Sequence, residues 1–286
     1  YEGRSARRRR RGRGKSRPER VSPRLFSFQG GLQRWPQALA QALGPNAVRT
    51  HTPAHSLHKL PGGRWAIEAE GGLRIEAGDV VIATPASAAA HLLEPVSSGG
   101  ARVLHDMPYS PVATVHQLYR RHAIRHPLDG FGLLVPTREH RPVLGILWVS
   151  SLFEGRAPEG TVLTTSFVGG ARSPERVTQS DGELADAVQA EHAALLGASE
   201  APVATRVCRW SQAIPRVEFG HVDRLATLTR MQELNPGIHL AGSYAEGGAA
   251  VPKCWERGRE VARRILDRRA SQREHPDAGR DLTLVP

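Results

Sequence analysis

The feature that most constrains the fold of this chain is its segment from His239 to Leu266, HLAGSYAEGGAAVPKCWERGREVARRIL, which reads as a strand, a turn of small residues and a helix. Such a turn brings backbone N–H groups toward a phosphate or a flat ring at the start of the helix. No strand followed by the glycine pattern GxGxxG precedes it. Gly12 and Gly14 lie in a charged block, RGRGKSRPER, with no strand before it. The segment therefore predicts one part of a nucleotide-binding or cofactor-binding site, although the GxGxxG motif that usually begins such a fold is absent from the sequence before it.

The composition is that of an ordinary globular chain. Of its 286 residues, 40% are hydrophobic and 23% are charged. Cys208 and Cys254 are far apart and have neither metal-site nor redox spacing, which is typical of a protein from a reducing compartment. No apolar run approaches the roughly 20 residues of a membrane span. We therefore expect a cytoplasmic protein of the enzyme or binding class.

The net charge of +11 is concentrated at the start of the chain. Residues 1–20 contain nine arginines and one lysine against two glutamates, which leaves little net charge for the rest. Blocks of this kind are usually solvated and disordered. We expect residues 1–24 to be a disordered basic arm or linker. Nucleic-acid binding is not expected, because neither interleaved aromatic residues nor a recognition fold accompanies the block.

Between residues 25 and 95 the pattern alternates between short helices and strands. FSFQGGLQRWPQALAQALG predicts a glycine turn and a short helix that Gly44 ends. RWAIEAEGGLRIEAGDVVIATP predicts a hairpin and then a strand at Val80–Ala83, apolar on both faces as in a covered sheet. Residues 86–95 have a helical pattern.

The middle of the chain, about residues 101–205, is rich in strand patterns separated by proline and glycine. One helix is marked by Ser180 and Glu183, which have the spacing of a capping box. The final helix has three apolar residues on one stripe: Val261, Ile265 and Leu266. Beyond about residue 268 the sequence is polar, and we expect a frayed tail.

The blocks FSFQGGLQRWPQAL, DVVIATPASAAAHLL, GFGLLVP, RWSQAIP and LAGSYAEGGAAVPKCWERGREVA occur in an order that resembles the C-terminal half of the flavin-dependent protoporphyrinogen and coproporphyrinogen oxidases, within the flavin amine oxidase superfamily. The resemblance covers about residues 25–266. It implies an α/β fold, in which part of an FAD-binding Rossmann-like domain surrounds an inserted, mostly β substrate-binding domain. The implied parts are FAD-domain segments at 25–85 and 206–267, the substrate-binding domain at 86–205, and a flexible tail at 268–286.

The resemblance also implies where the cofactor, FAD, would lie. The family holds its flavin between an N-terminal Rossmann unit and a C-terminal strand, turn and helix. The matching positions here are Gly248, Ala249, Ala250 and Val251 beside the isoalloxazine and ribityl chain, Trp210 at a further flavin contact, and Ala54 beside the adenine part. Small residues suit a backbone that approaches a flat ring. Pro252–Lys253 replaces an Asn–Asp or Pro–Asp pair of the family, and Gly247 and Ala249 replace bulkier residues, which alters the fine shape of this clamp.

For the substrate, GFGLLVP matches the family segment that sandwiches a tetrapyrrole. The candidate substrate-binding residues are Phe131, Gly132, Leu133 and Leu134. A porphyrinogen is a large apolar macrocycle and needs apolar walls. The implied reaction is oxidation of protoporphyrinogen IX, or coproporphyrinogen III, to the porphyrin in haem biosynthesis, with oxygen reoxidising FAD. No catalytic side chain is nominated, because the cofactor supplies the hydride acceptor.

The missing GxGxxG pattern raises alternatives. We expect a fragment that acts with a missing N-terminal half, which would also provide any peripheral contact with the inner membrane. Alternatively, the chain is a non-catalytic remnant or binding protein that uses its basic arm, or a related amine oxidase or carotenoid desaturase. The glycine–alanine turn, Phe131, Leu134 and Trp210 could also be ordinary packing residues. His51, His55 and His58 have metal-site spacing, but Pro53 breaks a helix there, so no metal is assigned.

Overall fold

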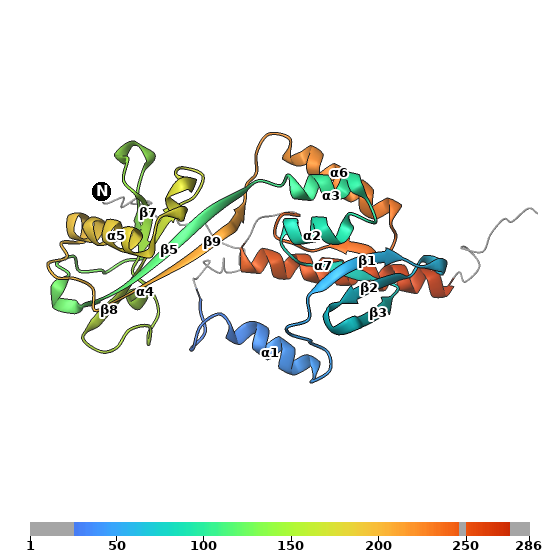
Figure 1. The fold of residues 1–286 in the computed structure, drawn as a ribbon. Helices are drawn as coiled ribbons and strands as arrows, with labels where there is room; N and C mark the ends of the chain where they lie inside the picture. The colour runs from blue at the N-terminus through green and yellow to red at the C-terminus, as the bar shows by residue number, and fades with distance from the viewer. Residues whose placement is uncertain (1–25, 246–249, 275–286) are drawn as a thin grey trace, which may run out of the picture. The chain divides into compact units, whose positions relative to one another are not determined.

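The computed structural model describes residues 26–245 and 250–274, so the predicted basic arm and the candidate residues Gly248 and Ala249 lie outside the described residues (Figure 1). The chain divides into two compact units between Val48 and Arg49. The α-helices of the described residues are α1 (Arg34–Leu43), α2 (Ala86–Leu93), α3 (Ser98–His105), α4 (Val149–Leu152), α5 (Asp181–Leu196), α6 (His221–Leu234) and α7 (Val251–Glu274). The strands are β1 (Ala54–Lys59), β2 (Trp65–Ala69), β3 (Leu73–Ala77), β4 (Val80–Ile82), β5 (Tyr109–Arg120), β6 (Gly132–Leu134), β7 (Val143–Leu147), β8 (Thr161–Gly169), β9 (Ala204–Pro215) and β10 (Ile238–Leu240).

The first unit contains helix α1, which confirms the helix predicted after the glycine turn. The helix ends at Gly44, whose φ of 92° is accessible to glycine at little cost. Phe28 packs its ring against Trp35, with ring centroids 6.2 Å apart. None of the helix residues is buried.

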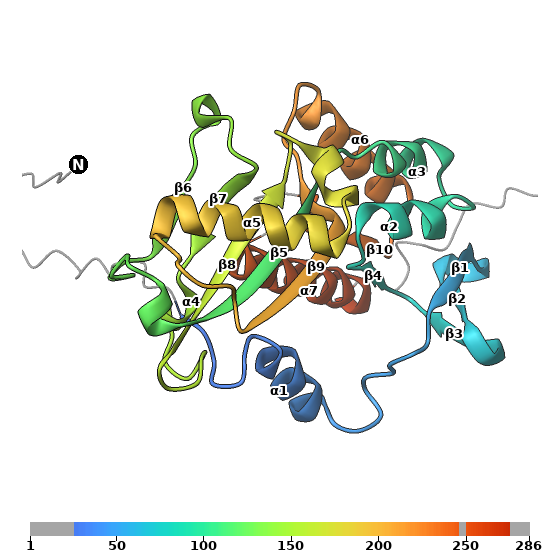
Figure 2. The same ribbon diagram turned by 60° about the vertical axis from the view of Figure 1, so that its left-hand side comes forward.

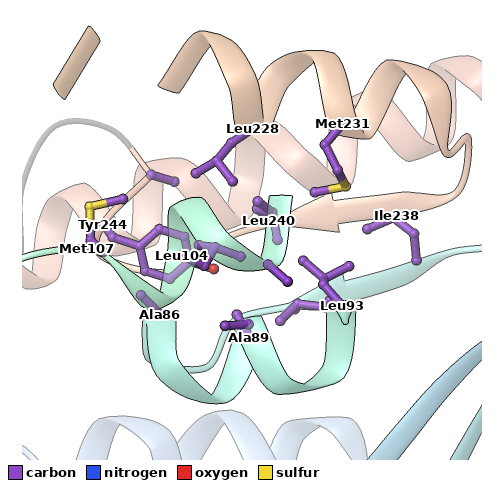
Figure 3. Packing of buried hydrophobic residues seen from close by; sticks show 14 of the residues in the cluster. Ala86, Ala89, Leu93, Leu104, Met107, Leu228, Met231, Ile238, Leu240 and Tyr244 are labelled. Carbon is purple, nitrogen blue, oxygen red and sulfur yellow. The ribbon is translucent and has the colours of Figure 1, made fainter. Parts of the chain in front are cut away.

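The first hydrophobic core of the larger unit joins two stretches that are far apart in the sequence. Strands β4 and β10 pair in parallel, and helices α2, α3 and α6 pack around them. Figure 3 shows the buried side chains of this core, which come from both stretches of chain. Members of this core include Ala86, Ala89, Leu93, Leu104, Met107, Leu228, Met231, Ile238, Leu240 and Tyr244. The antiparallel sheet β1-β2-β3 contributes Leu57 and Trp65, and its hairpin confirms the predicted one.

The second hydrophobic core lies between helix α5 and a five-stranded antiparallel sheet with the strand order β6-β7-β8-β5-β9 (Figure 2). Ala113 and Val115 of β5 pack with Leu184 and Val188 of α5 in this core. Alternate strand residues point to opposite faces, so the intervening residues of β5 face away from the helix. The helix begins at the predicted capping box. In it the Glu183 amide donates to the Ser180 hydroxyl and the Ser180 amide donates to the Glu183 carboxylate.

Three local expectations were wrong. Val81 of β4 is 45% exposed, because among the described residues β4 pairs only with β10 and packs on the core through one face. Leu266 is exposed, whereas Val261 of the same helix is buried. Helix α7 also continues past residue 268 to Glu274, since Arg268 and Arg269 near its end form ion pairs with Asp79.

The boundaries between the segments that form the first and the second core differ from the domain boundaries expected from the sequence. Helices α2 and α3, which lie within the segment expected to start the substrate-binding domain at residue 86, belong to the first core. Strand β9, which extends to Pro215, belongs to the five-stranded sheet. The chain thus enters the second core at β5 and leaves it after β9, and the cofactor and substrate roles assigned to these segments stay predictions. Within residues 26–245 and 250–274, no helix is long and apolar enough to cross a membrane.

Candidate functional site

An apolar pocket of about 360 Å³ lies against the five-stranded sheet. Its lining includes Val112, Thr114, Leu134, Phe167, Trp210 and Ile214. Among the lining residues, Thr114 alone has a hydrogen-bond acceptor in its side chain. Because Val112 and Thr114 alternate along β5 with the core residues Ala113 and Val115, the pocket lies on the face opposite α5.

The strand register explains why these side chains come together. Val112 of β5 pairs directly with Trp210 of β9, next to an irregularity between Ser110 and Val112. Trp210 is 59% exposed and Leu134 is 85% exposed. Large apolar side chains gathered on an open surface usually mark a binding face. The pocket is therefore the strongest candidate in the described residues for contact with an apolar ligand.

The structure brings one predicted substrate residue and one predicted cofactor residue, Leu134 and Trp210, into this pocket. The other substrate candidates behave differently. Leu133 packs against the second core, on the opposite side of β6. Phe131 is half-exposed, and its carbonyl accepts a hydrogen bond from the Trp148 amide at 3.2 Å. The assignment of all four residues to a substrate stays a prediction.

Gly132 has a structural reason to be glycine. Its φ is 153°, and a Cβ atom there would lie 2.2 Å from the carbonyl oxygen of Ile146 on the paired strand β7. Any larger residue would force β6 away from β7. This close pairing holds Leu134 at the pocket.

The predicted flavin-facing residues at the start of α7 are partly described. Ala250 precedes the helix, and its carbonyl oxygen accepts hydrogen bonds from the amides of Lys253 and Cys254. Val251 is exposed, and the first turn contains no acidic residue. The N-terminus of a helix of 24 residues carries a partial positive charge, so it suits an anionic group. Ala54, at the start of β1, pairs with Ala69 and does not line the apolar pocket.

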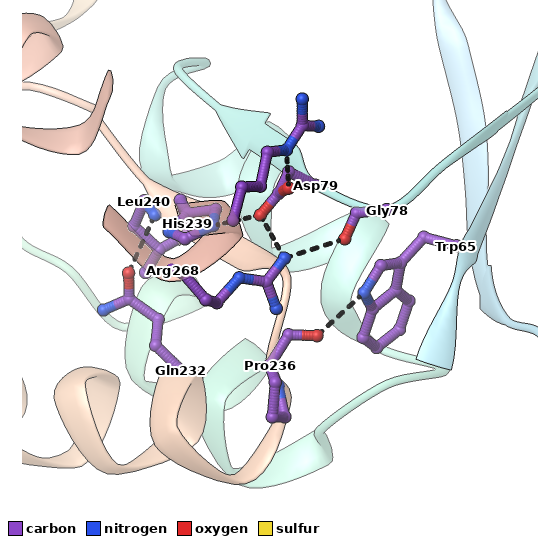
Figure 4. A network of polar contacts seen from close by, with 9 residues as sticks. Trp65, Gly78, Asp79, Gln232, Pro236, His239, Leu240 and Arg268 are labelled. Carbon is purple, nitrogen blue, oxygen red and sulfur yellow. Dashed lines mark hydrogen bonds and ion pairs between the residues drawn. The ribbon is translucent and has the colours of Figure 1, made fainter. Parts of the chain in front are cut away.

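Asp79 fixes the far end of α7, as Figure 4 shows. Its side chain is only 6% exposed and accepts hydrogen bonds at 3.0 Å from His239 Nε2 and from Arg269 Nε. Arg268 also pairs with this carboxylate and donates to the carbonyl oxygen of Gly78 at 3.2 Å. Burial raises the pKa of Asp79, but the hydrogen bonds from His239 and Arg269 and the two arginine charges outweigh it and lower the pKa. The cluster ties α7 to the β4–β10 pair.

A buried hydroxyl lies in the first hydrophobic core, on the segment that follows β10. Tyr244 is almost fully buried, and among the described residues its hydroxyl has no hydrogen-bond partner. Burial raises its pKa, and so does the neighbouring Tyr109. A buried polar atom without a partner is rare in a finished site. The region therefore fits a site that a further group completes.

Comparison of the sequence with known families shows the family to which the chain belongs. The sequence pattern of the flavin containing amine oxidoreductases matches residues 5–266. The chain belongs to this enzyme family. The family is flavin-containing, which implies FAD as the cofactor. The N-terminus of α7 is compatible with it, and so is the Tyr244 hydroxyl, which has no hydrogen-bond partner within the part of the chain that the structure describes.

Among curated relatives, the chain is 32% identical to the chloroplastic protoporphyrinogen oxidase of Nicotiana tabacum over 261 residues, which are 87% of this chain and 47% of that protein. It is 30% identical to the coproporphyrinogen III oxidase of Propionibacterium freudenreichii subsp. freudenreichii, covering 84% of this chain and 45% of that protein. The chain thus spans about half the length of the curated relatives it matches.

Among solved structures, a protein from Exiguobacterium sp. 255-15, described as a putative protoporphyrinogen oxidase, superposes with a TM-score of 0.72 at 23% identity. The superposition covers 82% of this chain and 51% of that one. This similarity shows that the mixed α/β fold is that of the flavin amine oxidases over about half of their length.

Sequence reasoning missed several residues of the site. Thr114, Phe167 and Ile214 line the pocket, and Asp79 anchors α7. In VATVHQLYRR, Thr114 and His116 lie two residues apart, and this spacing indicates that one face of β5 is more polar than the other. Pairing of β5 with β8 and β9 involves long sequence separations, so the pattern along one strand could not reveal its neighbours.

Proposed function

We propose that this chain forms the substrate-binding half of a flavin-dependent oxidase that converts a porphyrinogen, protoporphyrinogen IX or coproporphyrinogen III, to the porphyrin. The observation that carries the proposal is the apolar pocket that Leu134 and Trp210 share on the open face of the sheet. A pocket with apolar walls and one side-chain hydrogen-bond acceptor suits a large apolar macrocycle better than a small charged amine. The names of the curated relatives support the same substrate class.

The chain's own residues would bind and orient the substrate and exclude water. Leu134 and Trp210 would contact the macrocycle, and Trp210 would also border the flavin. Gly248, Ala249 and Ala250, which precede α7 in the sequence, and Val251 at its start would approach the flavin through their backbone. Bound FAD would supply the hydride acceptor, with oxygen as the final electron acceptor. No side chain is assigned as a general base.

Because the chain spans about half of each relative, we propose that catalysis requires the part of the fold that the chain does not cover. That part would carry the dinucleotide-binding motif predicted from the resemblance. A chimera tests both proposals: residues 26–266 of this chain replace the matching half of the Nicotiana tabacum relative. After retention of flavin has been verified, porphyrin formation is followed by fluorescence, with a primary amine as the competing substrate.

We expect porphyrin formation and no oxidation of the amine. Trp210→Ala and Leu134→Asp should each lower kcat/KM for the porphyrinogen by about tenfold, because each removes apolar contact area. Phe219→Ala is the matched control, since Phe219 is fully exposed and does not line the pocket. Oxidation of the amine in preference to the porphyrinogen would refute the proposed function.

A further inference from the structure

Thr114, the one lining residue of the apolar pocket with a side-chain hydrogen-bond acceptor, belongs to a short hydrogen-bonded chain. The hydroxyl of Thr114 lies 3.1 Å from Nε2 of His116. The other ring nitrogen of His116, Nδ1, lies 2.9 Å from the hydroxyl of Thr165 on the neighbouring strand β8. His116 pairs with Thr165 across the two strands, so the three side chains share the face on which the pocket lies.

The surroundings of His116 favour the neutral form of its ring. Burial lowers the pKa of His116, and the charge of Arg206, opposite it on β9, lowers it further. A neutral imidazole has one N–H donor and one acceptor nitrogen. When Nδ1–H donates to Thr165, Nε2 accepts from the Thr114 hydroxyl. In the other tautomer Nε2–H donates to the Thr114 oxygen, so in either case a lone pair of that oxygen is left for a ligand in the pocket.

We propose that Thr114, oriented by His116, accepts a hydrogen bond from a ring N–H of a flat apolar ligand and so determines the specificity of this pocket. A buried N–H without a partner is costly, whereas the apolar walls offer no other side-chain acceptor. The pocket therefore selects N–H heterocycles over hydrocarbons of the same shape. This rests on the proposed function only in identifying the natural ligand as a tetrapyrrole, whose pyrrole rings carry such N–H groups.

Two matched probes test the hydrogen bond. Carbazole is a flat tricycle with one ring N–H, and fluorene has the same shape with a CH₂ group in its place. Equilibrium dialysis of the full chain gives a dissociation constant for each, and the ratio of the two constants measures selectivity. In Thr114→Val the preference for carbazole should fall by about fivefold, the usual effect of losing one hydrogen bond.

Two further variants separate recognition from structure. Thr165→Val removes the other partner of His116 without touching the pocket lining, and its ratio should fall less than that of Thr114→Val, because the Thr114 hydroxyl is still present. Thr114→Ser retains the hydroxyl and should restore the preference. An unchanged ratio in Thr114→Val, an equal loss in Thr165→Val, or no binding of either probe would overturn the inference.

Protoporphyrin IX as a third probe distinguishes the inference from the proposed function. If selectivity for carbazole depends on Thr114 but protoporphyrin IX does not bind, the proposed substrate is wrong and the hydrogen-bond acceptor stands. If protoporphyrin IX binds the wild type but Thr114→Val leaves the ratio of the carbazole and fluorene dissociation constants unchanged, Thr114 is not the hydrogen-bond acceptor and the proposed substrate stands.

Discussion

His192 makes the stability of the second core depend on pH. Its imidazole is fully buried between α5 and the sheet, with Nε2 2.9 Å from the Ser166 hydroxyl and Nδ1 3.1 Å from the Tyr119 hydroxyl. Tyr119 donates its proton to Gln117 Oε1, so Nδ1–H of His192 must donate to Tyr119 and Nε2 must accept from Ser166. Protonation of Nε2 would therefore put a charge in the core and break the hydrogen bond donated by Ser166.

The size of the effect follows from the pKa of His192. Burial lowers it from 6.5 to about 4. Well above pH 6.5 the ring is neutral in both the folded and the unfolded chain, so titration of His192 does not lower the free energy of unfolding there. As the pH falls from 6.5 toward 4, the unfolded chain binds a proton that the folded chain does not, and stability is lost. At about 1.4 kcal/mol per pKa unit, the loss is on the order of 3 kcal/mol.

The assay is urea denaturation of the wild type and of His192→Gln, followed by circular dichroism at a series of pH values. Glutamine retains hydrogen-bonding groups but does not titrate. The wild type should lose about 3 kcal/mol more than the variant as the pH falls from 6.5 to 4, because the contributions of all other groups cancel in the difference. Parallel pH profiles for the two proteins would refute the reasoning.

Three further predictions concern stability, each measured by urea denaturation at neutral pH. Asp79→Asn should lower the free energy of unfolding by about 2 kcal/mol, because it removes the buried carboxylate with which Arg268 and Arg269 of α7 pair. Glu76→Gln, at an exposed ion pair, is the control and should change it by less than about 0.5 kcal/mol. Equal effects of the two substitutions would contradict the anchoring role of Asp79. Gly132→Ala should cost about 2 kcal/mol or more through the clash with the Ile146 carbonyl, and a neutral result would show that β6 can move. Ser180→Ala should cost about 1 kcal/mol by removing the capping box of α5, whereas Ser180→Asp should retain most of the stability.

The sequence predicted the local elements well because their signals are local. The capping box at Ser180, the glycine that ends α1, the strand β10 and the start of helix α7 are each set by residues within a few positions. The errors have a different origin. Helix α7 runs past residue 268 because Asp79, about 190 residues earlier, pairs with its arginines, and no local pattern reports such a partner.

The site was only partly predictable for the same reason. The resemblance to a family pointed to Leu134 and Trp210, and the structure places both in one pocket. The polar pair Thr114 and His116 was missed, because its meaning depends on the register of β5 with β8 and β9. A strand pattern shows which residues share a face but not what that face contacts.

The measurement that tests the central claim most directly is anaerobic reduction of the flavin in the chimera. The protein is mixed without oxygen with protoporphyrinogen IX or with a primary amine, and loss of the flavin's visible absorbance is followed in time. We predict rapid bleaching by the porphyrinogen, slower bleaching in Trp210→Ala, and none by the amine. Bleaching by the amine with no response to the porphyrinogen would contradict the assignment of this pocket to a tetrapyrrole.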